Sequence, residues 1–166
     1  MKVSTYVFGF MLFVGALPTP PAQSQEVKAG DLVISAPWSR AAPKGAEMAS
    51  SYLTIENKGT TADRLIGASA EIAEKLEIQQ ISKVGGGLTV KPVAGGLAIS
   101  PGEKVVLAPG GYFLALLKLK SALKKGSKLS MTLVFEKAGK ADVSFEVLSP
   151  AAKGPAAAPN ADGMKK

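Results

Sequence analysis

The chain has 166 residues, with 20 Lys and Arg against 13 Asp and Glu, and therefore a formal net charge of +7. It contains neither cysteine nor histidine. This composition excludes disulfides, thiolate nucleophiles, cysteine-bound zinc, iron–sulfur clusters, imidazole bases and imidazole metal ligands. This composition disfavours most enzyme classes, and we expect a protein that is not an enzyme. A hydrophobic content of 46% suffices for one packed domain, and 18 Gly with 11 Pro favour a turn-rich β architecture.

Residues 1–24 have the features of a signal peptide. Lys2 supplies the positive charge, and an apolar run of about a dozen residues follows from Tyr6 to Leu17. The small-x-small sequence that ends at Ser24 predicts cleavage before Gln25. An uncleaved membrane anchor is the alternative, but the run is short of the roughly 20 residues that a bilayer span needs. We expect a periplasmic protein that contacts the membrane only through this segment.

Residues 25–149 are predicted to form one domain of short antiparallel strands. Alternation of apolar and polar residues, with turns rich in Gly and Pro between the runs, marks most of the strands. Residues 71–74 fit a single helical turn. Eight or nine such strands are typical of an antiparallel β-sandwich with little helix. In chain order, the predicted strands are 32–34, 51–56, 64–68, 76–81, 88–93, 105–107, 112–119, 129–135 and 142–147.

The end of the chain has a different composition. Residues 150–166 are rich in Ala and Pro and show no periodic apolar face. Such a segment cannot bury enough apolar surface to offset the entropy of ordering. We therefore predict a disordered tail.

Five short motifs occur in a fixed order along the predicted domain. Together they resemble the PCu(A)C family of periplasmic copper chaperones, and the match covers residues 26–148. The resemblance implies a cupredoxin-like β-sandwich that carries Cu(I) and helps to load the copper centre of cytochrome c oxidase. The motifs are APWSRA (36–41), SYLTIEN (51–57), DRL (63–65), LAPGGY (107–112) and LSMTLVFEKAG (129–139).

The resemblance also implies where copper ligands would stand. The two His and two Met ligands of the family fall on positions that here hold Gln79, Val90, Phe113 and Ala115. The interval from Val90 to Phe113 is one residue longer than in the family, but neither neighbour of Val90 is a thioether. Cu(I) is a soft ion that prefers thioether, thiolate or imidazole donors. We therefore expect a degenerate member with no metal or other cofactor of its own.

The replaced ligands leave several interpretations open. Hydrophobic residues have either simply filled an abandoned site, or Phe113 and Ala115 contribute to a docking surface for another protein. One alternative is an active Cu(I) chaperone that recruits Met48 and Met164, since Met131 is expected in the core. Another is a sandwich that binds a small apolar ligand where copper would sit.

Five lysines within eleven residues form a second candidate surface. They could steer association with an acidic periplasmic protein or a partner in copper-site assembly, although such lysines are more often a solvated face. Nucleic acid is not expected, because no exposed aromatic series accompanies these charges. The five residues are Lys118, Lys120, Lys124, Lys125 and Lys128.

Within the first motif, Trp38 is expected as a core anchor. Arg40 is expected on the opposite face as an ion-pair donor to Asp63 or Glu56. The whole sequence predicts a monomeric, non-enzymatic accessory protein in copper handling or respiratory oxidase assembly.

Overall fold

The structure is a computed structural model that describes residues 26–155. The predicted signal peptide, its cleavage site and Met164 lie outside the described residues. Eleven strands and no helix make up the regular structure of the described part. The strands are β1 (Val27–Ala29), β2 (Leu32–Arg40), β3 (Met48–Asn57), β4 (Asp63–Ser69), β5 (Ala73–Val84), β6 (Gly87–Pro92), β7 (Leu97–Ile99), β8 (Lys104–Val106), β9 (Tyr112–Leu119), β10 (Lys128–Phe135) and β11 (Gly139–Leu148).

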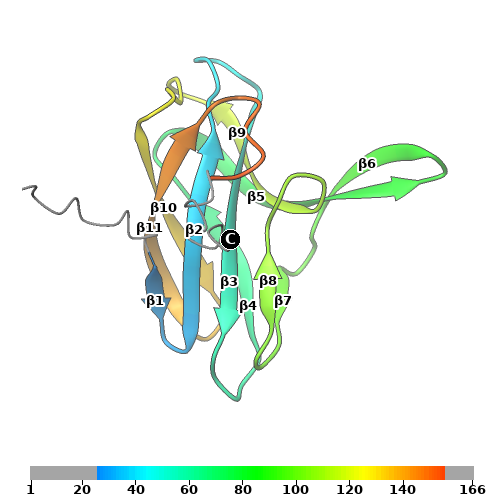
Figure 1. Ribbon diagram of the computed structural model, residues 1–166, viewed down its shortest axis with the longest axis vertical. Coiled ribbons are helices and arrows are strands. Elements are labelled where there is room, and N and C mark those ends of the chain that lie inside the picture. Colours follow the sequence, from blue (N-terminus) through cyan, green and yellow to red (C-terminus); the bar gives the residue numbers. More distant parts are fainter. Residues whose placement is uncertain (1–25, 156–166) are drawn as a thin grey trace, which may run out of the picture.

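The strands form one continuous sheet that folds on itself into a sandwich (Figure 1). Their order is β6-β5-β9-β3-β2-β11-β10-β4-β7, with β1 added to β2 and β8 added to β3. The sheet curls until β4 contacts β5, so strands from the two halves of this order enclose a common core. All pairings are antiparallel except that of β2 with β11. The prediction of an all-β sandwich is therefore confirmed.

The alternation of apolar and polar residues along the strands places the apolar side chains in the core. In β10, Leu129, Met131, Leu133 and Phe135 are buried, while the residues between them face outwards or are half-buried. Burying one such large side chain contributes about 1.5–3 kcal/mol. Met131 is 2% exposed, which confirms that it fills the core.

Two local predictions were wrong or incomplete. Residues 71–74 do not form a helical turn, because the amide of Ala73 closes a tight turn on the carbonyl of Ala70 and β5 begins at Ala73. The strands β1 and β7 were not predicted. Each has three residues, which is too short for alternation to stand out from the surrounding loops.

One hairpin leaves the body of the sandwich. Beyond Gln80, β5 pairs only with β6, and the two strands project sideways beyond the rest of the molecule (Figure 1). We call residues 80–92 the arm. Its turn is made by Gly85 and Gly86, whose φ angles of 59° and 86° suit glycine.

Candidate functional site

The four positions that the resemblance equates with copper ligands lie on one face of the sheet. Gln79 pairs directly with Phe113 across β5 and β9, and Ala115 is two residues further along β9. Val90 pairs with Ile81, which is two residues beyond Gln79 in β5. Directly paired residues, and residues two apart in one strand, project to the same side of a sheet. The fold therefore gathers Gln79, Val90, Phe113 and Ala115 on a common surface, which we call the site face.

Hydrocarbon fills the centre of the site face. Phe113 and Ala115 are 2% and 0% exposed and pack with Trp38 and Tyr52 in a second hydrophobic cluster, separate from the main core. The rings of Trp38 and Tyr52 lie 4.4 Å apart between centroids and are tilted by 30°. Phe113 and Ala115 are buried, so the hypothesis that they form part of an exposed docking surface was wrong. Trp38 is buried as expected.

The side-chain amide of Gln79 forms a hydrogen bond with a neighbouring residue. Its amide nitrogen donates a hydrogen bond to a carboxylate oxygen of Glu77 at 3.0 Å. The other oxygen of Glu77 lies 2.6 Å from the ammonium of Lys75. Lys75, and then the Gln79 amide, hold the pKa of Glu77 below its ordinary value of 4.5. Gln79 thus retains only an amide oxygen as a free donor, and this hard oxygen does not fit a soft ion such as Cu(I).

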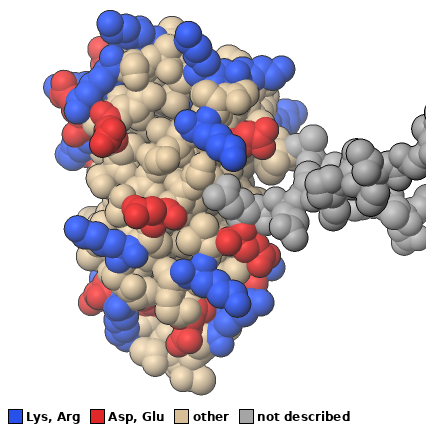
Figure 2. Space-filling view, turned by 90° about the vertical axis from the view of Figure 1, so that its left-hand side faces the viewer, with Lys and Arg blue, Asp and Glu red and all other residues tan. Residues whose placement is uncertain are grey.

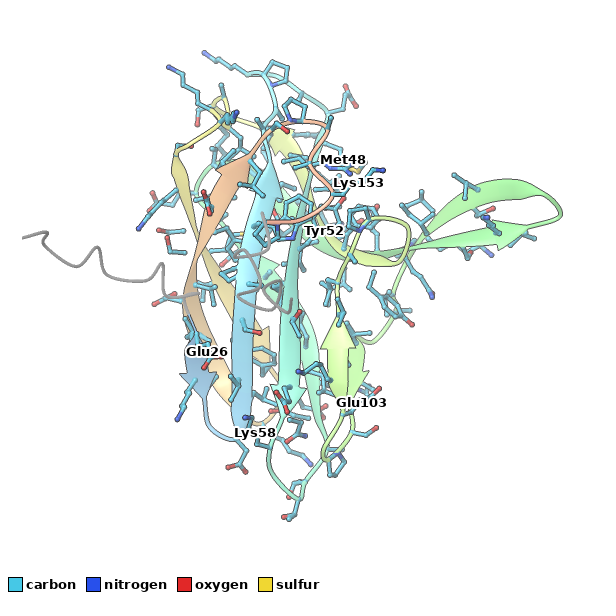
Figure 3. All side chains as sticks on the ribbon, viewed as in Figure 1. Glu26, Met48, Tyr52, Lys58, Glu103 and Lys153 are labelled. Atoms are coloured by element: carbon cyan, nitrogen blue, oxygen red, sulfur yellow. The ribbon has the colours of Figure 1, made fainter. Side chains whose placement is uncertain are left out.

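Met48 adds one thioether at the edge of the same face. It pairs with Leu117, two residues from Ala115 in β9, and is 45% exposed. Figure 3 shows it at the upper end of β3, with Tyr52 lower on the same strand. A single thioether leaves the coordination of Cu(I) incomplete. Among residues 26–155, no group of three or more His, Cys, Asp or Glu side chains could hold a metal ion.

The segment that follows β11 crosses part of this face. Ala152 packs against the cluster of Trp38 and Tyr52, and its carbonyl accepts a hydrogen bond from Nε of Arg40 at 3.0 Å. The amide of Ala152 in turn donates to the carbonyl of Ser149 at 3.0 Å. The predicted tail was placed from residue 150 onwards. Its first six residues are described and include these contacts, and residues 156–166 lie outside the described part.

Arg40 does not have the predicted ion-pair role. Its guanidinium lies 5.7 Å from the centre of the Tyr52 ring and bonds to Ala152 rather than to Asp63 or Glu56. It also lies on the same side as Trp38, because residues two apart in a strand share a face. The prediction of opposite faces was therefore wrong.

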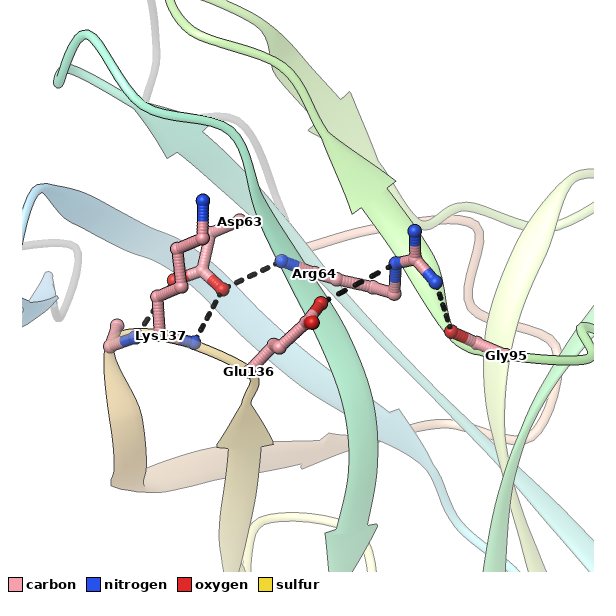
Figure 4. Close-up of polar contacts among 6 residues, drawn as sticks. Asp63, Arg64, Gly95, Glu136 and Lys137 are labelled. Carbon is pink, nitrogen blue, oxygen red and sulfur yellow. Dashed lines mark hydrogen bonds and ion pairs between the residues drawn. The ribbon is translucent and has the colours of Figure 1, made fainter.

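Asp63 holds a turn together through hydrogen bonds with backbone amides that the sequence did not predict. Its carboxylate accepts three backbone N–H bonds, from Arg64 at 2.7 Å and from Lys137 and Ala138 at 2.9 Å each (Figure 4). Burial opposes its ionisation, but these N–H donors and the charge of Lys137 outweigh burial and lower its pKa below the ordinary 3.8. The side chain joins the start of β4 to the β10–β11 turn, and its role is structural.

The five lysines are all exposed. Lys118 forms an ion pair with Glu74 at 3.3 Å. The carboxylate offsets the positive charge that Lys118 presents to a partner protein. The loop that carries Lys124 and Lys125 pairs with the loop 41–47 through Ala42 and Leu123. Figure 2 shows Lys and Arg side chains at the upper end of the molecule, with acidic side chains interspersed below them.

Two cavities lie away from the site face. One of about 190 Å³ is lined by residues that include Gly30, Asn57 and Asp63. A shallower one of about 620 Å³ lies near Ser69 and Asp142. In residues 26–155 there is no helix of sufficient length and apolar character to span a membrane.

The fold is that of a domain of the PCuAC type. The family model described as "Putative lipoprotein LpqE-like" matches residues 32–147. The chain therefore belongs to the LpqE-like family, which has the PCuAC fold of copper chaperone domains. A curated relative, "Putative lipoprotein Lxx21020" of Leifsonia xyli subsp. xyli, is 29% identical over 126 residues, which are 76% of this chain and 75% of the relative.

Solved structures agree with this assignment. The apo PCuAC domain from PmoF1 is 35% identical, with a TM-score of 0.64, and the match covers 76% of this chain and all of that domain. The copper-bound PCuAC domain from PmoF2 is 28% identical, with a TM-score of 0.63, over 76% of this chain and 99% of that domain. The Cu(I) form of DR1885 from Deinococcus radiodurans, at 20% identity and a TM-score of 0.57, covers 80% of this chain and 85% of that protein and shares the fold.

Proposed function

We propose that this protein is a non-enzymatic accessory protein in copper handling or respiratory oxidase assembly that has no high-affinity Cu(I) site of its own. The observation that carries the proposal is the chemistry of the site face. Val90, Phe113 and Ala115 offer no donor atom, and Gln79 offers an amide oxygen. None of the 166 residues is a cysteine or histidine that could replace them.

Export to the periplasm is part of the proposal. The features of residues 1–24 support a cleaved signal peptide. A relative and the family model are both described as lipoproteins, a class of exported proteins. In this proposal, cleavage before Gln25 gives the exported protein, whose sequence contains no cysteine that could carry a thioether-linked lipid.

The surface that would meet a protein partner is basic. The lysines near the β9–β10 connection are exposed, and the loop 41–47 adds Lys44 beside them. An acidic periplasmic protein would be steered toward this end, with an effect that weakens as salt is raised. Phe113 and Ala115 take no part in this contact, because they are buried.

A Cu(I) titration against a chromophoric chelator under anaerobic conditions tests the proposal. We expect no competition by the exported protein at nanomolar free Cu(I). The matched control is the variant with four restored donors, Gln79→His, Val90→Met, Phe113→His and Ala115→Met, and we expect it to bind one ion. Circular dichroism checks that this variant folds, since Phe113 is buried.

The same titration separates the alternatives. Nanomolar one-to-one binding by the natural protein would overturn the proposal. If Met48→Leu or truncation after Pro155, which removes Met164, abolished that binding, the protein would be an active chaperone that uses these methionines. The alternative of a sandwich that binds a small apolar ligand has less support, because the side chain of Phe113 already occupies the centre of the site face.

A further inference from the structure

The arm concentrates exposed apolar side chains. Of the six large hydrophobic residues that are exposed in the described part of the chain, three are on the arm: Val84 at 60%, Leu88 at 71% and Val90 at 49% exposure. The other three, Met48, Ile66 and Val106, lie on three different strands. Exposed hydrophobic residues that gather in one projecting element indicate a contact with something outside the chain.

The apolar side chains of the arm point to both of its faces. Leu88 pairs with Lys83, and Val90 with Ile81, on the face that continues the site face. Val84 pairs with Gly87 on the opposite face. A groove on a partner protein would cover one face and leave the other in water. A lipid interface surrounds the tip of a hairpin and covers both faces.

The charge of the arm is uniformly positive. No Asp or Glu occurs between Glu77 and Glu103, whereas Lys83 and Lys91 both lie on the arm and are exposed. Neither lysine forms an ion pair within the described residues. Lysine side chains can bury their stems beside apolar groups while the ammonium stays at a polar surface. Apolar groups flanked by unpaired cations complement an anionic lipid surface.

We propose that the arm docks the protein on anionic membrane surfaces, a contact additional to that of the signal peptide expected from the sequence. Val84, Leu88 and Val90 enter the headgroup region, and the ammonium groups of Lys83 and Lys91 contact lipid phosphates. Insertion is shallow, because the backbone groups of the turn at Gly85 and Gly86 need water or headgroups as partners. The arm projects beyond the sandwich, so its tip can reach a flat surface without obstruction (Figure 1). Docking would hold the site face, which continues onto the arm, close to the membrane.

Sedimentation with vesicles tests the docking. The exported protein, with its N-terminus read by mass spectrometry, is mixed with vesicles of phosphatidylcholine alone or of equal parts phosphatidylcholine and phosphatidylglycerol. We expect binding only to the second kind, and a decrease as salt rises. The double variant Leu88→Ser with Val90→Ser should bind about tenfold more weakly. The variant Lys83→Gln with Lys91→Gln should also lose about tenfold.

Matched controls change the same residue types elsewhere. Ile66→Ser with Val106→Ser removes two exposed hydrophobic residues, and Lys28→Gln with Lys140→Gln removes two exposed lysines. All variants share one N-terminus, so any contact made by that segment is common to them. Both controls should bind within about twofold of the natural protein, since neither changes the arm.

A fluorescent label reports whether the tip enters the lipid. The chain has no cysteine, so Leu88→Cys creates a single site for an environment-sensitive dye. We expect a blue shift with anionic vesicles at position 88 and none with the dye on Ile66→Cys. Vesicle binding that is absent, or equally weakened in arm and control variants, would overturn the proposal. So would a label at position 88 that does not respond, or self-association through the arm, seen by analytical ultracentrifugation, without vesicle binding.

Discussion

Phe113 shows how a single residue changes the chemistry of a surface. It pairs with Gln79 at the centre of the site face and packs against the aromatic pair of Trp38 and Tyr52. The aromatic ring at this position contributes buried apolar surface and offers no donor atom to a metal ion. Large-to-small changes at such a position typically cost 3–5 kcal/mol. The residue therefore stabilises the fold at a position where the resemblance implies a copper ligand.

Asp63 should make the free energy of unfolding depend on pH. Its pKa is lowered in the folded protein, so its ionised form contributes stability above about pH 3.8, and this contribution is lost as the pH falls through the lower folded value. Asp63→Asn should cost about 1–3 kcal/mol at pH 7, because an amide cannot accept all three backbone bonds. It should cost less at pH 2–3. Urea unfolding, followed by the fluorescence of Trp38, measures both values.

A neighbouring carboxylate provides the control for this prediction. Glu136 forms an exposed ion pair with Arg64 at 3.7 Å, so Glu136→Gln should change stability by less than about 0.5 kcal/mol. Equal effects of the two substitutions, or a cost of Asp63→Asn that does not shrink in acid, would contradict the assigned role of Asp63.

At the scale of elements, the turn before β7 depends on close backbone approach. Gly96 has a φ of +86°, and a Cβ at this position would overlap with the carbonyl oxygen of Leu65. Gly95 also has a positive φ of +75°, but its Cβ would meet only the end of the Arg64 side chain, at 3.7 Å. The two glycines thus share a backbone conformation and differ in the space around them.

This difference predicts unequal costs for the same substitution. Gly96→Ala should destabilise the protein by about 3 kcal/mol, from backbone strain together with the overlap. Gly95→Ala should cost about 1 kcal/mol, from strain alone. The midpoint of urea unfolding gives both values, and similar costs at the two positions would show that close approach does not matter here.

For the whole molecule, stability without disulfides depends on how completely the sheet covers its apolar surfaces. The main core lies inside the sandwich, whereas the cluster of Trp38, Tyr52, Phe113 and Ala115 lies on the site face. The segment after β11 contacts this second cluster through Ala152, and Arg40 bonds to the same residue. A short stretch of chain therefore joins the end of the domain to its outer cluster.

Two truncations test this contact. A chain that ends at Pro150 loses Ala152 and its hydrogen bond with Arg40, and should be less stable by about 1–2 kcal/mol. Trp38, which is 4% exposed in the full chain, should then become accessible to a quencher such as acrylamide. A chain that ends at Pro155 keeps the segment and should retain natural stability and quenching. A loss of the same size in both would place the effect beyond residue 155.

The sequence by itself determined the class of the fold, because alternation in runs such as 129–135 and 142–147 follows directly from the geometry of a half-buried strand. It also determined the absence of thiolate and imidazole donors, since that depends only on which residues are present. Pairing across strands was decided by the tertiary structure, and it brought Gln79, Val90, Phe113 and Ala115 to one face. Burial of Phe113, the contact of Arg40 with Ala152, the three bonds of Asp63 and the projection of the arm depend on residues distant in the chain. Local patterns carry no information on such contacts.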